Sequence, residues 1–252
     1  MKKILLSSVV FLIFTGCVPP GGELETPDVE ATPHNQGAEL MLSWDPVPDA
    51  EQYVIIYNDE EDTITETSYV ITEPATTVQV IAIAEGFKDS EPWEEDYTAV
   101  VSTIEVYPVT DPDPEHPSGF GFNVHGEAST YPVSDKSTWP DIDYYIADDG
   151  TNYILAAPVD HLPEPINNEY NASHEEEAIS FDDLDIAAGP GVYSTQNPLS
   201  TNALFSLWLT DNTEYDLSDH YGKLQVQGIS GTKISLRVAY QKTPGLRWVK
   251  TQ

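Results

Sequence analysis

Alternating apolar and polar residues predict short β-strands in the first half of the chain. Between residues 38 and 44, Leu40, Leu42 and Trp44 share one face of a strand, and Glu39 and Ser43 occupy the other. Further strands are predicted at 53–57, 68–71, 78–84 and 99–106. Short strands separated by turn residues at intervals of about ten are typical of a β-sandwich.

A second set of strands follows after residue 118. These strands are predicted at 120–124, 128–133, 143–147, 153–157 and 203–209. The clearest element is a closing hairpin, in which Leu224 and Val226 precede a turn at 228–231 and apolar residues alternate with polar ones along 234–240. That pattern predicts one buried and one solvated face. We therefore expect an all-β fold, with a β-sandwich followed by a second, larger, mainly-β domain.

Residues 42–55 (Leu-Ser-Trp-Asp-Pro-Val-Pro-Asp-Ala-Glu-Gln-Tyr-Val-Ile) resemble the region between strands B and C of a fibronectin type III domain. In that family the tryptophan, here Trp44, packs across to the strand that carries the tyrosine, here Tyr53. Residues 78–86 are similar to strand F, although Val78 stands where the family has tyrosine. The resemblance covers about residues 27–107. It implies a spacer or a binding platform and brings no functional residues with it.

The chain starts with Lys2 and Lys3, continues with an apolar stretch at 4–14, and then reaches Cys17, its single cysteine. The apolar stretch is too short to span a bilayer as a helix and has the layout of a secretory signal. It resembles the lipobox of bacterial lipoproteins, which implies cleavage before Cys17 and acylation of that residue. An ordinary signal peptide is the alternative. Val18 is not the aspartate associated with inner-membrane retention, so we expect a lipid-anchored protein of the cell envelope, at the outer membrane or the cell surface.

These patterns predict five segments. They are a lipoprotein signal peptide at 1–16, a flexible tether at 17–34, a fibronectin type III-like domain at 35–107, a Pro/Asp linker at 108–117 and the second domain at 118–252. The linker is expected to be stiff and extended, because its frequent prolines restrict the backbone and suppress regular pairing.

The composition is strongly acidic, with 43 Asp and Glu against 10 Lys and Arg and a formal net charge of −33. This balance argues against nucleic acid as a partner and against electrostatic binding to anionic lipid. Solubility is the favoured explanation of the acidity, and binding of calcium or a cationic ligand is the alternative. Six basic residues lie on or just beyond the closing hairpin and are expected to be solvated: Lys223, Lys233, Arg237, Lys242, Arg247 and Lys250.

The second domain resembles the HmuY-like lipoproteins of bacteria. The similar pieces are scattered over most of residues 118–242, at 119–127, 139–145, 221–229 and 239–241. The best-known members bind haem through two histidines, but no motif in this chain assigns a haem histidine to a particular position. The histidines of this domain, which could act as axial ligands, are His125, His161, His174 and His220.

Acidic loops offer candidate calcium ligands. Asp141, Asp143, Asp148 and Asp149 precede Gly150, and a second acidic group lies at 182–185. Both lack the regular spacing of oxygen ligands that ends in a bidentate glutamate. A solvated loop is therefore the favoured interpretation of each.

The sequence shows no signature of an enzyme. It contains no G-x-S-x-G motif, no phosphate-binding loop and no cysteine nucleophile. Acidic pairs carry little information in a chain with so many carboxylates. Several aromatic residues could form a sugar-stacking surface, although core packing is favoured for them: Trp139, Tyr144, Tyr145, Tyr153, Trp208 and Tyr215.

We therefore expect a membrane-anchored lipoprotein of the cell envelope that is a non-enzymatic binding or adhesion module, with any ligand specificity in the second domain. A scavenger of haem or another small ligand, of HmuY-like type, is the alternative. No cofactor is predicted, and haem and calcium remain the candidates. The expected partners are the membrane, through the lipid anchor, and an envelope macromolecule, a polysaccharide or haem.

Overall fold

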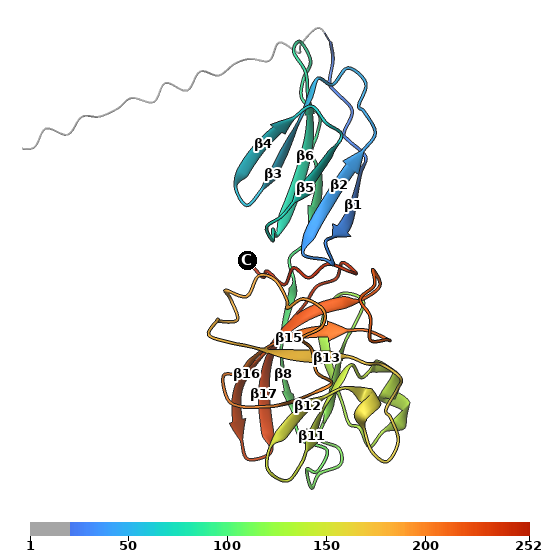
Figure 1. Ribbon diagram of the computed structural model, residues 1–252, viewed down its shortest axis with the longest axis vertical. Helices are drawn as coiled ribbons and strands as arrows, with labels where there is room; N and C mark the ends of the chain where they lie inside the picture. Colours follow the sequence, from blue (N-terminus) through green and yellow to red (C-terminus); the bar gives the residue numbers. More distant parts are fainter. Residues whose placement is uncertain (1–20) are drawn as a thin grey trace, which may run out of the picture.

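The computed structural model describes residues 21–252, which form two β-sandwiches stacked end to end (Figure 1). The first sandwich pairs a three-stranded sheet with a four-stranded sheet. In sheet order these strands are β1 (Val29–His34), β2 (Glu39–Trp44) and β5 (Ser68–Ile71), and then β4 (Glu60–Ile64), β3 (Gln52–Tyr57), β6 (Thr77–Ile83) and β7 (Trp93–Asp96). All pairings between these strands are antiparallel.

The core of the first sandwich contains the expected tryptophan–tyrosine contact. The rings of Trp44 and Tyr53 lie 5.1 Å apart, edge to face, and both residues are buried. The Tyr53 hydroxyl also accepts a hydrogen bond of 2.9 Å from the Val47 N–H, in the turn between the two strands. The predicted packing of Trp44 on the tyrosine strand is confirmed.

The first sandwich begins earlier in the chain than predicted. Residues 29–34 were expected to belong to a flexible tether, but they form β1, which pairs with β2 along its whole length. Leu24 is already buried in the core, and its N–H donates to the Lys88 carbonyl at 3.0 Å. The alternation is weak in this stretch because none of the six residues of β1 is fully buried. The remainder of the predicted tether, and Cys17, lie outside the described residues.

Strand β8 (Val100–Val106) belongs to the second sandwich, so the predicted domain boundary at 107 is wrong. This strand pairs with β17 (Lys233–Tyr240), and Ile104 and Val106 enter the second core. The polar strand β7 closes the first sandwich instead. Alternation predicts a strand but not its partner, which is why β8 was assigned to the wrong sheet.

The Pro/Asp segment at 108–117 folds back on the second sandwich and is not an extended linker. The Val109 N–H donates to the Ile146 carbonyl at 2.9 Å, and the Tyr107 N–H donates to the Pro117 carbonyl at 2.8 Å. His116 stacks on Tyr107 at 4.0 Å, and its Nδ1 lies 2.9 Å from an Asp111 carboxylate oxygen. These contacts make the segment a loop between β8 and β9.

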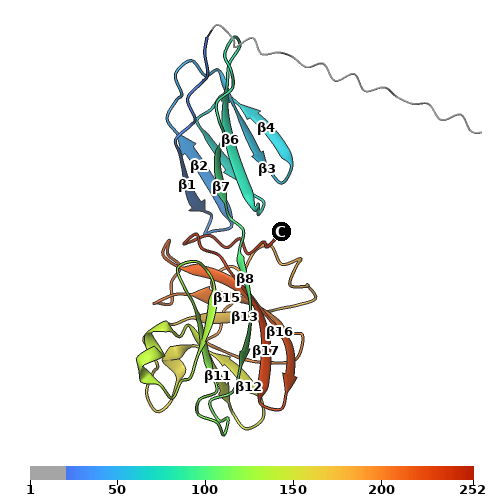
Figure 2. The same cartoon turned by 180° about the vertical axis from the view of Figure 1, so that it is seen from behind.

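The second sandwich consists of two five-stranded sheets (Figures 1 and 2). One contains β10 (Ala128–Tyr131), β9 (Gly119–Phe122), β11 (Tyr144–Asp148), β12 (Tyr153–Ala156) and β14 (Gln196–Pro198), and the other β13 (Ala172–Glu176), β15 (Leu204–Leu209), β16 (His220–Ser230), β17 and β8. Two short 3₁₀ helices, at Lys136–Asp141 and Pro158–Asp160, lie in its loops. Phe120, Tyr144, Phe205 and Leu224 are among the buried residues between the sheets. The expected all-β fold, a β-sandwich followed by a second, larger, mainly-β domain, is confirmed, and the second domain is itself a sandwich.

The outer face of the closing hairpin, predicted to be solvated, is solvated only in part. The β16–β17 turn lies at Gly231, where φ is +64°, and Tyr221 and Lys223 on the outer face are completely buried. Phe181 and Leu184, from the loop at 177–193, cover this outer face. The predicted solvation of Lys223 is therefore wrong, because a loop distant in sequence packs over the strand.

The C-terminal segment returns to the first sandwich after β17 (Figure 2). Trp248 is fully buried in the first core, and its Nε1 donates to the Ala38 carbonyl at 2.9 Å. The Arg247 Nε–H donates to the Gln36 carbonyl at 2.9 Å. The first core is thus completed by residues that follow the second sandwich in the chain.

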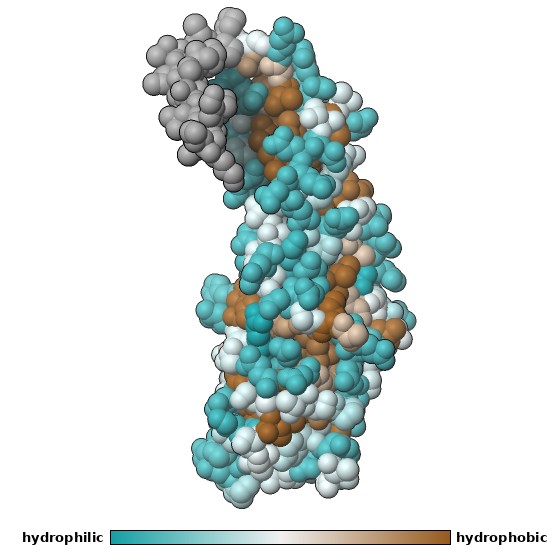
Figure 3. Space-filling view, turned by 90° about the vertical axis from the view of Figure 1, so that its left-hand side faces the viewer, coloured by the Kyte–Doolittle hydropathy of each residue, from teal (hydrophilic) through white to brown (hydrophobic). Residues whose placement is uncertain are grey.

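The face shown in Figure 3 is largely hydrophilic, with hydrophobic residues gathered in separate areas on both sandwiches.

Candidate functional site

A cavity of about 280 Å³ lies at the end of the second sandwich where β8 enters from the first one. The two sheets contribute Phe122, at the end of β9, and Tyr240, at the end of β17. His220, at the start of β16, also lines the cavity. Loop residues Asp143 and Glu169 complete its polar wall. The cavity therefore gathers residues that are up to 118 positions apart in the sequence, from Phe122 to Tyr240.

Asp143 and Glu169 form a carboxyl pair in this wall, and their side chains share a hydrogen bond. Burial raises the pKa of Asp143 well above its usual range, and the neighbouring charge of Glu169 raises it further. Burial also raises the pKa of Glu169, whereas the hydrogen bond from Asp143 lowers it. The pKa of Asp143 rises further than that of Glu169, which favours Asp143 as the protonated member of the pair.

Backbone and amide groups fix the carboxyl pair in place. The Phe122 N–H donates to Asp143 Oδ2 at 2.7 Å. The Asn171 amide donates to the Asp143 carbonyl and to Glu169 Oε2, both at 2.9 Å. Asn171 is itself buried, and its Oδ1 accepts from the Thr210 N–H at 2.7 Å. The carboxyl pair is thus held in a set of hydrogen bonds before any ligand arrives.

Three nearly parallel rings form another part of the cavity wall. Phe122 and Tyr240 stack at 4.7 Å with 20° between their planes, and Tyr240 and His220 stack at 5.2 Å with 18°. Burial lowers the pKa of His220, so its ring is neutral at pH 7. Its Nδ1 lies 3.2 Å from the Gln241 carbonyl, which holds the proton on that nitrogen and leaves Nε2 as an acceptor.

The hydroxyl of Tyr240 has no hydrogen-bond partner among residues 21–252, although the residue is only 9% exposed. Burial raises the pKa of this phenol, and the charges of Asp143 and Glu169 raise it further, which places the hydroxyl near the carboxyl pair. The hydroxyl oxygen is not one of the buried side-chain atoms that lack a partner in residues 21–252, so it stays accessible from the solvent. Tyr240 is therefore a group that a ligand in the cavity could satisfy.

The cavity lining carries a strongly negative set of side chains. Asp211 and Asp219 join Asp143 and Glu169, and no Lys or Arg belongs to the described lining. Burial raises the pKa of Asp219, whose Oδ2 accepts from the Asp216 N–H at 2.9 Å. The site is thus suited to ligands that donate hydrogen bonds or carry positive charge.

The four predicted calcium ligands do not come together. Asp143 lines the cavity, whereas Asp148 is the last residue of β11, about 16 Å away at 3.3 Å per residue, and Asp149 follows it. The Asp148 carboxylate accepts from the Thr110 hydroxyl at 2.7 Å and from the Gly150 N–H at 2.8 Å. Asp141 is exposed. Across residues 21–252, no group of three or more His, Cys, Asp or Glu side chains could hold a metal ion.

The four candidate haem histidines have different surroundings. His125 is exposed in the β9–β10 turn. His174 packs against Tyr193. In the sheet His174 lies opposite Ser206 and His220 lies opposite Leu209, both on β15. Residues three apart on a strand point to opposite faces, so the two histidines lie on opposite faces of the sheet. Of the four, His220 alone lines the cavity.

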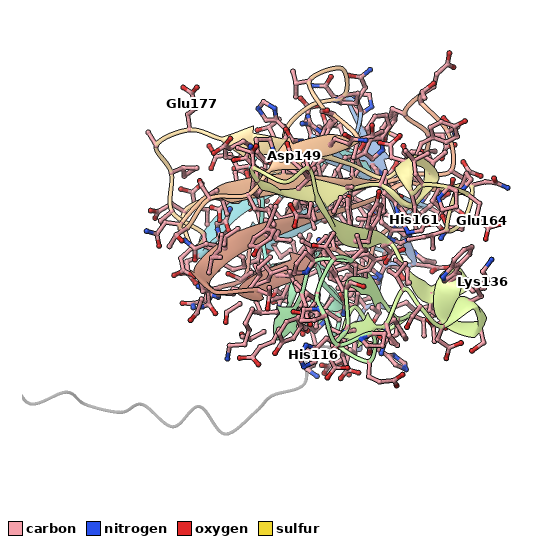
Figure 4. The ribbon with its side chains drawn as sticks, turned by 90° about the horizontal axis from the view of Figure 1, so that it is seen from below. His116, Lys136, Asp149, His161, Glu164 and Glu177 are labelled. Atoms are coloured by element: carbon pink, nitrogen blue, oxygen red, sulfur yellow. The ribbon has the colours of Figure 1, made fainter. Side chains whose placement is uncertain are left out.

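His161 lies at a different place on the second sandwich, where it contacts the rings of Trp139 and Tyr145 at 6.0 and 5.3 Å. The ion pair between Lys136 and Glu164 is beside it (Figure 4). The structure thus gives this histidine a packing role in a loop and does not bring it to the cavity.

The predicted strand aromatics belong mainly to the core. Tyr144 is fully buried, and its hydroxyl donates to the carbonyls of Ala172 and Trp208 at 2.9 and 3.0 Å. Trp208 lies in a separate cluster on the other side of its sheet. The favoured interpretation of these residues as core is confirmed for Tyr144, Tyr145 and Trp208.

Replacing Asp143 with asparagine is expected to raise the free energy of unfolding at pH 7 by about 1 kcal/mol or more. The pKa of Asp143 is higher in the folded state than in the unfolded state, so the folded state binds more protons between these two pKa values. The stability of the wild type therefore falls as pH rises through that interval, and asparagine, which does not titrate, removes this loss. Urea unfolding at pH 5 and pH 7 should show a smaller loss of stability in the variant. The exposed Asp89→Asn is the control, and equal pH dependence in wild type and Asp143→Asn would contradict the protonated carboxyl.

Residues 21–252 contain no helix long and apolar enough to cross a membrane. No protein-family model matches the chain, and no curated protein matches it. Among solved structures, the chain has a weak likeness to the crystal structure of a DUF4466 family protein from Parabacteroides merdae ATCC 43184, with a TM-score of 0.42 and 8% sequence identity. That alignment covers 87% of this chain and 100% of the other.

Proposed function

We propose that this chain is a lipid-anchored, non-enzymatic binding protein of the cell envelope, and that its second domain binds a small polar ligand in the cavity beside Asp143. The observation that carries this proposal is one cavity that joins the stacked rings of Phe122, Tyr240 and His220 to the Asp143–Glu169 pair. Ligand sites combine an apolar or aromatic wall with a few fixed polar groups, and this cavity contains both.

The arrangement of the carboxyl pair supports binding over hydrolysis. Glycosidases place their two carboxyl groups about 5 Å or more apart, so that a sugar or a water fits between them. Asp143 and Glu169 are instead hydrogen-bonded to each other. Each of them also accepts a hydrogen bond from the protein, which fits a role in positioning a ligand.

The binding proposal is tested with a panel of monosaccharides, amino sugars, amines and amino acids, followed by the melting temperature of the purified full chain. We expect at least one compound to raise the melting temperature of the wild type. Tyr240→Phe should reduce that increase, whereas Tyr170→Phe, at an exposed position outside the cavity, should leave it unchanged. The proposal fails if no compound stabilises the protein, or if Tyr240→Phe responds like the wild type.

The anchor proposal rests on the sequence around Cys17, which lies outside the described residues. Two or three acyl chains, at about 0.8 kcal/mol for each buried CH₂, would hold the protein on a membrane. Cys17→Ala is expected to abolish incorporation of labelled palmitate and to move the protein from the membrane fraction to the soluble fraction. Ser8→Ala, within the apolar stretch, is the control. Persistent labelling of Cys17→Ala would contradict the proposal.

Haem scavenging is the alternative function, and His220 is the histidine that favours it, since its Nε2 is free to coordinate. A cavity of about 280 Å³ is at the small end of ligand sites, and a second axial histidine is not provided there. We therefore expect no saturable Soret shift when haem is added to the full chain. A shift at one equivalent that is lost in His220→Ala would make scavenging the function. Calcium remains the other cofactor candidate, to be tested by titration in the same assay of melting temperature.

A further inference from the structure

We propose that the ligand group bound in this cavity is an organic ammonium, held by the Glu169 carboxylate, the Tyr240 hydroxyl and the His220 ring. This inference deepens the proposed function and rests on it, because it names the chemistry of the ligand at the same site. An ammonium group on an organic ligand occurs on amino sugars and on lysine side chains, and the two sources share this chemistry.

Charge is the first argument. Glu169, Asp219 and the more exposed Asp211 supply the negative charge of the lining, and no cationic side chain of the described lining offsets them. An anionic ligand would be repelled by Glu169, and burial in the cavity would strengthen that repulsion. A cationic ligand would instead supply the counter-charge that the protein does not.

The acceptors are the second argument. A primary ammonium has three N–H donors and no acceptor. The Glu169 carboxylate, the accessible hydroxyl oxygen of Tyr240 and the lone pair on His220 Nε2 are three acceptors on residues that line one cavity. The stacking of Tyr240 between Phe122 and His220 holds two of the three in fixed positions.

A bare metal ion fits this lining less well. Calcium takes six to eight oxygen ligands, and the described residues contain no cluster of three or more side chains suited to a metal. Asp143 is occupied in two hydrogen bonds, one from the Phe122 N–H and one to Glu169. A cation with directional N–H donors matches the few free acceptors better.

Binding of an ammonium should release a proton. A positive charge beside Glu169 favours ionisation of its hydrogen-bonded neighbour Asp143, whose proton then passes to the solvent. The other titratable groups near this pair are Asp141, Asp211, Asp219, His220 and Tyr240. Affinity for the ammonium should therefore increase with pH between pH 5 and pH 7, where both an amino sugar and a lysine side chain are mainly protonated.

The test is isothermal titration calorimetry of the full chain with glucosamine and with Nα-acetyl-lysine amide, which separate the two sources. N-acetylglucosamine and the Nε-acetylated lysine derivative are the uncharged counterparts. We expect at least one amine to bind at least tenfold more tightly than its uncharged counterpart, with proton release shown by different heats in phosphate and HEPES buffers, neither of which contains a primary ammonium.

Substitutions of the lining residues test whether the amine binds in the cavity. Glu169→Gln keeps the size and the hydrogen bond from Asn171, and should weaken binding of the amine at least tenfold. Tyr240→Phe should weaken it about threefold or more, and it provides a second variant if Glu169→Gln does not fold. Glu51→Gln makes the same chemical change at an exposed position of the first sandwich and should leave binding unchanged.

The outcomes separate this inference from the proposed function. If uncharged compounds bind as tightly as the amines and Tyr240→Phe weakens them, the cavity is a binding site but the ammonium is wrong. If amines bind equally to wild type, Glu169→Gln and Tyr240→Phe, the binding lies elsewhere and the inference is overturned. If neither class binds and the wider panel also fails, the proposed function fails with it.

Discussion

Replacing Trp248 with alanine is expected to lower the free energy of unfolding by about 3–5 kcal/mol, because a fully buried tryptophan would leave a cavity in the first core. The loss also includes the hydrogen bond from Trp248 Nε1 to the Ala38 carbonyl and the edge-to-face contact with Tyr97 at 5.9 Å. Since Trp248 follows the second sandwich in the chain, we also expect the two sandwiches to unfold less cooperatively.

Differential scanning calorimetry of the full chain checks both parts of this prediction. The wild type should unfold in one transition, and Trp248→Ala in two, with the first sandwich melting earlier. Trp93→Ala is the matched control, because Trp93 is only partly buried on the edge strand β7 and should cost less. A single unshifted transition in Trp248→Ala would show that the C-terminal segment does not contribute to the first core.

Replacing Lys223 with methionine is expected to lower the free energy of unfolding at pH 7 by about 2–4 kcal/mol. The Lys223 ammonium is fully buried and donates to the Phe181 and Leu184 carbonyls at 2.6 and 2.8 Å. Methionine fills similar space but donates no hydrogen bond, so both carbonyls would lose this partner. The ammonium also lies 4.6 Å from the centre of the Phe181 ring, a contact that the variant loses.

The pH dependence of this effect has a definite sign. Burial lowers the pKa of Lys223 to about 8, while the nearby Asp185 and Asp182 raise it in part. Between pH 8 and the unfolded-state pKa of about 10.4, the unfolded state binds more protons, so this group makes the protein more stable as pH rises. Neutral lysine still donates hydrogen bonds, so the difference between wild type and Lys223→Met should widen from pH 8 to pH 10.

Urea unfolding at pH 7, 8, 9 and 10 measures this difference, and limited proteolysis reports on the loop at 177–193. Cleavage in that loop should be faster in Lys223→Met than in the wild type. Lys242→Met, at an exposed position after the hairpin, is the control and should change neither property. If Lys223→Met has the stability of the wild type at all four pH values, the buried ammonium does not hold the loop.

Local alternation predicted the strands of this fold well and their partners poorly. The pattern around Leu40 and Leu42 identified β2, and the turn before Tyr53 identified the start of β3, because both sheets of the first sandwich have one buried face. The same pattern could not show that β8 pairs with β17, since pairing depends on residues more than a hundred positions away. It also could not show that Phe181 covers Lys223.

Only some residues of the candidate site were predicted, and they were predicted as ligands of calcium or haem. Asp143 was selected as a calcium ligand and His220 as a haem ligand, yet they meet in one cavity. Glu169 and Tyr240 were missed as site residues, because Glu169 lies in an irregular loop and Tyr240 read as an ordinary strand residue. The signal that could have drawn attention to Tyr240 is its stacking position beside His220, which depends on the pairing of β16 with β17.

The chain crosses between the two sandwiches twice, before β8 and again after β17. Two domains joined by a single segment of chain can rotate relative to each other about that segment. Here a second connection, with Trp248 buried in the first core, prevents this rotation. The cavity therefore keeps a constant orientation relative to β1 and the first sandwich. Many copies held at their amino ends would each present the ligand site in the same orientation relative to the first sandwich. A multivalent ligand could then bind neighbouring copies without a rotation of the second sandwich in each of them.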